Sequence, residues 1–167
     1  MTPFLLSQIL AAITLIIGMT AFQMKQRKHI LRGWFLAAVV AAAHFYLLGN
    51  YEACVLVLVT ATRFLVASFS TNQRFMYVFL ALSVVGYILT YSEPVSLLAF
   101  AATLIGTVGS FRQSETAVRT TMMSTEILWL VHNFLVWSPV AMAMEVLFFS
   151  SNLLGYLRHR KPQKSAL

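Results

Sequence analysis

Five side chains that could carry charge or exchange protons interrupt long apolar stretches of this sequence. They are two histidines, two glutamates and one arginine: His44, His132, Glu126, Glu145 and Arg63. A charged group at membrane depth costs about 2.5–3.5 kcal/mol on insertion scales, so it must face protein or water. A histidine titrates near neutral pH and can take up and release protons. The residue types therefore predict ion pairing and proton-linked gating within a membrane.

One apolar stretch, 120–137, contains two of these residues, Glu126 and His132, together with Trp129 and Asn133. At 100° per residue, a helix over this stretch places Glu126, Trp129, His132 and Asn133 with Thr125 on a face about 120° wide. Because lipid cannot solvate this face, we expect the other helices to be arranged around it.

The composition identifies the class of protein. Of the 167 residues, 59% are hydrophobic and 10% are charged, whereas a soluble domain carries about 25% charged residues. We therefore expect an all-α polytopic membrane protein in one domain, 1–167. The single cysteine, Cys54, excludes an internal disulfide and a cysteine-based metal cluster. The chain contains no aspartate, which excludes aspartyl dyads and phospho-aspartate chemistry.

Apolar runs predict seven membrane spans, each of roughly the length needed to cross a ~30 Å hydrocarbon core. The short links between the runs predict that sequential helices are antiparallel neighbours. The expected spans are 4–24, 31–49, 53–69, 75–91, 95–111, 120–137 and 140–157.

The basic residues fall almost entirely in alternate links and the C-terminal tail. Eleven of the twelve Lys and Arg residues fall on this one side, with Arg32 at the very start of the second span, and only Arg63 lies deep within a span. The positive-inside rule then predicts an outside N-terminus and a cytoplasmic C-terminus. The same placement indicates a lipid bilayer, and no nucleic acid, as the partner of the net charge of +7. No basic residue precedes the first span, so we expect an uncleaved first helix.

Weak internal similarity predicts a three-one-three arrangement of parallel repeats. The segment 44–63 resembles 132–156, and His44 and His132 are 88 residues apart. Phe22 and Phe111 are 89 residues apart. The predicted parts are repeat one over about 4–69, a linker helix over about 75–91, repeat two over about 95–157, and a basic tail over 158–167.

This plan resembles the SWEET and PQ-loop transporter superfamily, including PnuC-type vitamin transporters. The chain more closely resembles the YgjV family of bacterial inner-membrane proteins, through HFYLLGNY (44–51), TATR (60–63) and WLVHNF (129–134), with Glu145 and Asn152 following. The resemblance covers most of the chain. It implies a SWEET-like fold and a multi-pass inner-membrane location. No Pro-Gln pair opens a cytoplasmic link here, which departs from the wider superfamily's pattern.

Sorting the polar residues by depth predicts two layers within the membrane. His44, His132 and Glu145 lie about 7–8 Å below the outer boundary, and Arg63 and Glu126 about 9 Å from the cytoplasmic one, at 1.5 Å per residue. The outer layer and a possible Arg63–Glu126 latch would gate a central cavity. The gating or proton-linked residues are therefore His44, Arg63, His132 and Glu145. The predicted substrate-binding residues are Thr60, Glu126, Trp129, Asn133 and Asn152.

Purely structural roles compete with these functional ones. Arg63 could extend its charge to the headgroups instead of pairing with Glu126. The two histidines could be hydrogen-bond donors between helices. Glu145 could be an acid favoured by the N-terminus of the last span. The small residues Gly33, Ala37 and Ala41 predict close packing of the second span, within the fold or in a homo-oligomer.

The leading hypothesis is a transporter or facilitator of a small polar solute, and the alternative is a non-transporting scaffold or sensor. No motif for an enzyme, a metal or a cofactor is present, so we expect no enzyme activity, metal or cofactor. A retinal protein needs a lysine within a span, and every lysine lies in a link or the tail.

Overall fold

The computed structural model describes residues 2–49, 51–91 and 93–159. These residues form seven α-helices and no strand, which confirms the predicted all-α class. The predicted basic tail lies mostly outside the described residues, with Arg160, Lys161 and Lys164. The helices are α1 (Pro3–Phe22), α2 (Arg27–Leu47), α3 (Tyr51–Phe69), α4 (Gln73–Thr90), α5 (Ser96–Ser110), α6 (Glu115–Leu135) and α7 (Pro139–His159).

Local sequence accounts for where several helices begin. The side chains of Thr2, Asn72 and Ser114 each accept a hydrogen bond from a backbone N–H of the first turn of α1, α4 and α6. These residue types satisfy N–H groups that have no partner within the helix. With Ser114 as its cap, α6 begins at Glu115, five residues before the predicted start of the sixth span at 120. The first turn of α6 therefore contains residues that the sequence analysis places in a link.

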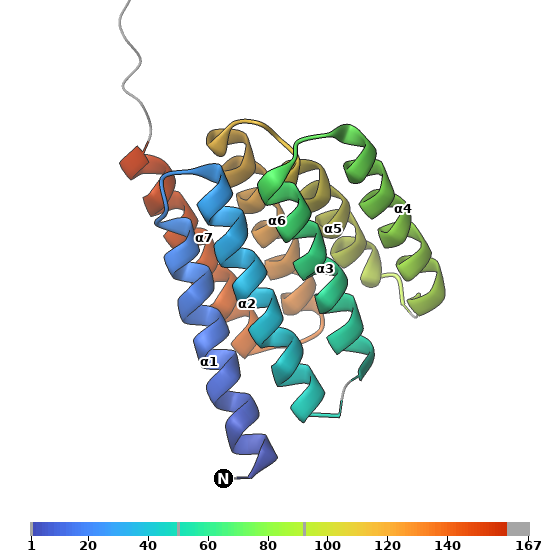
Figure 1. The fold of residues 1–167 in the computed structure, drawn as a ribbon. Helices are drawn as coiled ribbons and strands as arrows, with labels where there is room; N and C mark the ends of the chain where they lie inside the picture. The colour runs from blue at the N-terminus through green and yellow to red at the C-terminus, as the bar shows by residue number, and fades with distance from the viewer. Residues whose placement is uncertain (1, 50, 92, 160–167) are drawn as a thin grey trace, which may run out of the picture.

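The helices pack as two groups with α4 at one side (Figure 1). In the first group α2 lies between α1 and α3, and in the second α6 lies between α5 and α7. The groups meet through α1 against α7 and α3 against α5, while α4 contacts α5 and α3. Links 23–26, 70–72 and 111–114 lie at the same end as the end of α7, and we call this the basic end.

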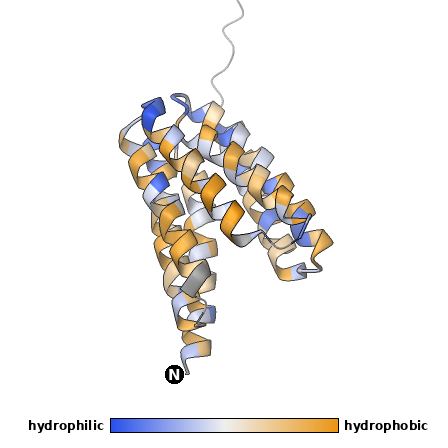
Figure 2. Cartoon of the chain, turned by 90° about the vertical axis from the view of Figure 1, so that its right-hand side faces the viewer, coloured by the Kyte–Doolittle hydropathy of each residue, from blue (hydrophilic) through white to orange (hydrophobic). Residues whose placement is uncertain are grey.

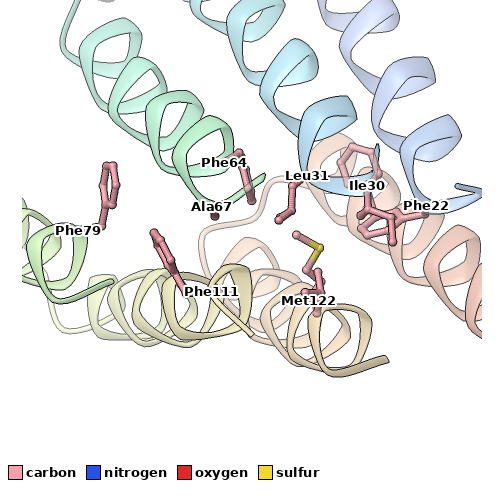
Figure 3. Close-up of a cluster of buried hydrophobic side chains, with 10 residues drawn as sticks. Phe22, Ile30, Leu31, Phe64, Ala67, Phe79, Phe111 and Met122 are labelled. Atoms are coloured by element: carbon pink, nitrogen blue, oxygen red, sulfur yellow. The ribbon is translucent and has the colours of Figure 1, made fainter. Parts of the chain in front are cut away.

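Figure 2 shows the helices gathered at the basic end and splayed at the end where the N-terminus lies. Buried apolar side chains form a core near the basic end. Figure 3 shows Phe22, Leu31, Phe64 and Met122 gathered from α1, α2, α3 and α6. The two groups are therefore held together mainly at the basic end.

Three helices, α1, α2 and α7, are long and apolar enough to cross a membrane by length and composition. Shorter apolar helices lie within α3, α4 and α5. The outer surface carries large apolar side chains such as Ile88, Leu89 and Val140, which are 69%, 79% and 73% exposed. A soluble monomer rarely exposes so much apolar surface, whereas lipid covers it at no cost. The most polar helix, α6, lies between two others, as its polar face requires.

Candidate functional site

A cavity of about 280 Å³ lies between the two helix groups. Its apolar wall includes alanines of α2 and the aromatic side chains of Trp34, Phe64 and Phe148. A small number of polar groups converge on it from both groups, which is the usual composition of a small-molecule site. The polar or indole-bearing residues that line it are Thr14, Trp34, Thr60, Arg63, Thr103, Thr125, Glu126, Trp129 and Glu145.

Aromatic rings line the part of the cavity nearer the basic end. The centroid of the Trp34 ring lies 5.1 Å from that of Phe22, 5.0 Å from that of Phe148 and 6.0 Å from that of Phe64. These four residues come from α2, α1, α7 and α3, so they join the two groups. We call them the aromatic floor.

Beyond the aromatic floor, Arg119 joins α6 to the end of α1. The Arg119 side chain is fully buried. Its two terminal nitrogens donate hydrogen bonds to the carbonyl oxygens of Phe22 and Met24, each at 2.5 Å. Its Nε donates to the Glu115 carboxylate one turn earlier. The carbonyls at a helix C-terminus have no partner within the helix and carry partial negative charge, so a guanidinium satisfies both needs.

Arg27 makes the corresponding contact from the first group. From the first turn of α2, it donates to the carbonyl oxygens of Arg112 at 2.5 Å, Ser110 at 2.7 Å and Ala67 at 2.6 Å. Ser110 is the last residue of α5, and Arg112 follows it by two. We call Arg27 and Arg119, with the carbonyls that they bind, the two arginine clamps. Each connects the middle helix of one group to the end of a helix in the other.

Arg63 is buried, with 8% of its surface exposed, and it does not form the predicted latch with Glu126. Its terminal nitrogen donates to Thr107 Oγ1 at 2.6 Å and to the Thr103 carbonyl at 3.3 Å, both on α5. In the described part of the chain the one ion pair joins Arg119 and Glu115. The possible Arg63–Glu126 pair therefore does not form, because Arg63 faces α5, where the Thr107 hydroxyl accepts a hydrogen bond from it. Nor does its guanidinium extend to the headgroups.

Four buried polar atoms of the described residues have no hydrogen-bond partner. Three belong to residues that line the cavity: Trp34 Nε1, Arg63 Nε and Glu126 Oε2. The fourth is Asn152 Oδ1. Because an unpaired buried polar group costs about 1–3 kcal/mol, a cluster of them marks a place where a partner is missing.

The structure brings some of the predicted substrate-binding residues together and separates others. Thr60, Glu126 and Trp129 line the cavity, as does Glu145. Asn133 and Asn152 are buried but are not among the lining residues. The Asn152 amide instead donates to the backbone carbonyl of Arg119 at 3.0 Å.

The two histidines hold neighbouring helices together away from the cavity lining. His44 Nδ1 donates to the Ser7 carbonyl at 2.8 Å, which joins α2 to α1. His132 Nδ1 donates to the carbonyl of Val95, just before α5, at 3.2 Å. These are the interhelical hydrogen bonds that competed with the gating role in the sequence interpretation.

Sequence reasoning missed both arginine clamps, because it placed Arg27 and Arg119 in links as topology signals. A signal was present for Arg119. Ser114 followed by Glu115 is a typical helix start, which places Arg119 one turn inside a helix. No group of three potential metal-ligating side chains is found among the described residues.

The fold and the cavity define an all-helical membrane protein whose polar groups converge between two helix groups. The family model that matches residues 5–163 is that of YgjV, described as a bacterial inner membrane protein. The chain therefore belongs to this family, and its location is the bacterial inner membrane. It is 26% identical to the inner membrane protein YgjV of Escherichia coli (strain K12) over 167 residues, which cover all of this chain and 91% of that protein. No solved structure matches the chain.

Proposed function

We propose that the protein is a transporter or facilitator of a small polar solute, which binds in the cavity between the two helix groups. The observation that carries the proposal is the cavity itself. It contains a guanidinium and two carboxyl groups among mostly apolar walls, at the boundary of two separately packed groups. Intramembrane ionisable groups are costly and in general mark solute or ion pathways.

The proposal includes two parallel repeats, and equivalent contacts support them. His44 contacts the residue 37 positions earlier, and His132 does the same. Both the histidines and their partners, Ser7 and Val95, are 88 residues apart. Two copies of a three-helix unit, related by an axis along the membrane normal, place equivalent contacts at the same sequence offset. Both residues of each contact are then shifted by the same number of positions.

The carbonyls that the arginine clamps bind follow the same offset, whereas the two arginines themselves are 92 residues apart. Arg119 binds the carbonyls of Phe22 and Met24, and Arg27 binds those of Ser110 and Arg112. The two pairs of carbonyls are again 88 residues apart. With the N-terminus outside, as the positive-inside rule predicts, both clamps lie at the cytoplasmic side. In this proposal they close that side, and the solute leaves when the two groups separate there.

The rival function is a non-transporting scaffold or sensor. It predicts a closed bundle in which the other helices satisfy every intramembrane polar group. The cavity and the three unpartnered atoms beside it favour transport instead. The transport function requires neither a cofactor nor a chemical step, and we propose no enzyme activity.

Cysteine accessibility tests this function without knowledge of the solute. Cys54 is the only cysteine, so Cys54→Ala gives a background without thiols. In that background, Thr60→Cys places one thiol in the cavity lining. Transport by alternating access predicts that a membrane-impermeant, charged thiol reagent modifies it from either side, in intact cells and in inverted membrane vesicles.

Leu58→Cys in the same background is the matched control, because Leu58 is 44% exposed on the outer surface of α3. A thiol facing lipid should react with a charged reagent from neither side. If Thr60→Cys reacts from one side only, or from neither, the cavity does not open alternately and the transport proposal fails.

A further inference from the structure

The unpartnered polar atoms around the cavity differ in kind between the two helix groups. The first group contributes unpartnered donors, Trp34 Nε1 on α2 and Arg63 Nε on α3. The second group contributes an unpartnered acceptor, Glu126 Oε2 on α6, and the carboxyl group of Glu145 on α7. The cavity therefore has a donor side and an acceptor side.

Charge follows the same division. The Arg63 guanidinium is 8% exposed and has no acidic partner among the described residues, since its hydrogen bonds go to Thr107 and Thr103. Neither Glu126 nor Glu145 has a basic partner in the same part of the chain. Buried charges in proteins are normally paired, so each side of the cavity lacks a group of the opposite sign.

We infer that the cavity binds a small aminocarboxylate, with its carboxylate toward Arg63 and Trp34 and its ammonium group toward Glu126 and Glu145. The inference rests on the proposed transport function and names its substrate class. A carboxylate accepts from the guanidinium and from the indole N–H, and an ammonium group donates to carboxylates. A zwitterion supplies both missing charges and adds no net charge to the cavity.

The size of the cavity suits this class of solute. Its volume of about 280 Å³ lies just below the range of roughly 300–1,000 Å³ found for drug-sized ligands. The apolar side chains beside the polar groups, such as Ala38 and Met122, would contact the carbon skeleton. Because the ends of the solute contact different helix groups, its binding would also link the groups.

The test is a thermal-shift assay on the purified full-length protein in detergent. The probes are L-alanine, L-leucine and 5-aminovalerate, each compared with the analogue that lacks the amino group and the analogue that lacks the carboxylate. At about 100-fold its Kd, a bound solute should raise the Tm by about 5–10 °C. We expect this rise with at least one aminocarboxylate and with neither of its one-ended analogues.

Conservative variants connect the shift to the site. Glu126→Gln keeps the shape of the side chain, and Trp34→Phe keeps an aromatic ring, although a smaller one; each removes one proposed contact. Each should lower the affinity at least tenfold, since a charged or desolvated polar partner is lost. The matched control for Glu126→Gln is Glu93→Gln, because Glu93 is exposed and lies outside the cavity lining. It should bind as the unchanged protein does.

The outcomes separate this inference from the function on which it rests. An equal Tm rise with an amine alone or a carboxylate alone overturns the two-ended site. A rise with a neutral sugar, and with none of the aminocarboxylates, overturns the substrate class but leaves transport standing if the cavity thiol reacts from both sides. Full binding by both conservative variants shows that the solute binds elsewhere and also overturns the inference.

Discussion

Replacing Arg119 by alanine should be among the most damaging single changes in this protein. The side chain is fully buried and donates to the carbonyls of Phe22 and Met24 and to the Glu115 carboxylate. A hydrogen bond from a charged donor contributes about 1.5–3 kcal/mol, so losing the two carbonyl contacts costs about 3–6 kcal/mol. The Glu115 pair adds about 0.3–0.5 kcal/mol, because its carboxylate is partly exposed.

The free energy of unfolding in mixed micelles, from titration with a denaturing detergent, measures this loss. Arg112→Ala is the matched control, because Arg112 is exposed and its side chain makes no hydrogen bond among the described residues. Its change should stay within about 0.5 kcal/mol. Arg119→Lys should fall between the two, since an ammonium group keeps the charge but lacks the planar fork.

A small loss of stability in Arg119→Ala would contradict the role of the clamp. If Arg119→Ala costs less than about 1 kcal/mol, or no more than the Arg112 control, the clamp does not hold α6 to α1. The contacts would then be incidental, and the proposed closure at the cytoplasmic side would lose its main element. A large cost for Arg119→Ala together with a small one for Arg119→Lys would show that charge alone suffices.

Two further predictions test the packing of α1 against α2. Gly33→Ala should destabilise the protein by about 1–3 kcal/mol, because an added Cβ would lie 2.5 Å from the Cβ of Ala21 and 3.2 Å from its Cα. Gly86→Ala, whose added Cβ has its nearest neighbour at 3.9 Å, should be nearly neutral in the same unfolding assay, and equal losses would contradict the close packing. His44→Phe should cost about 0.6–1.7 kcal/mol through the lost bond to a carbonyl of α1. His29→Phe, at an exposed position, is its control, and no difference between the two histidine variants would show that the bond contributes nothing.

The helices could be predicted from the sequence because their signals are local. Apolar runs and polar links fix how many helices form and roughly where they end, and the described part of the chain confirms the count of seven. The start of α6 was placed too late, at Thr120, because hydropathy outweighed the capping signal of Ser114. Hydropathy marks where lipid contact begins, whereas capping marks where the backbone becomes helical.

The candidate site could be predicted only in part. Thr60, Glu126 and Trp129 line one cavity, and depth along a helix follows directly from sequence position, while their role in binding a solute stays a prediction. The possible Arg63–Glu126 pair does not form, because two residues at the same depth meet only if their helices also turn them toward each other. Arg63 instead faces Thr107.

Composition, hydropathy and residue spacing are sufficient for the membrane class, the seven helices of the described residues, the family resemblance and the 88-residue offset between His44 and His132. Only the tertiary structure revealed that Arg27 and Arg119 are clamps, and that Trp34, Arg63 and Glu126 carry unpartnered atoms beside one cavity. The physical reason is the range of the interactions. Hydropathy and capping act within one helix, whereas the partner of a buried polar group depends on how helices distant in sequence pack and rotate against one another.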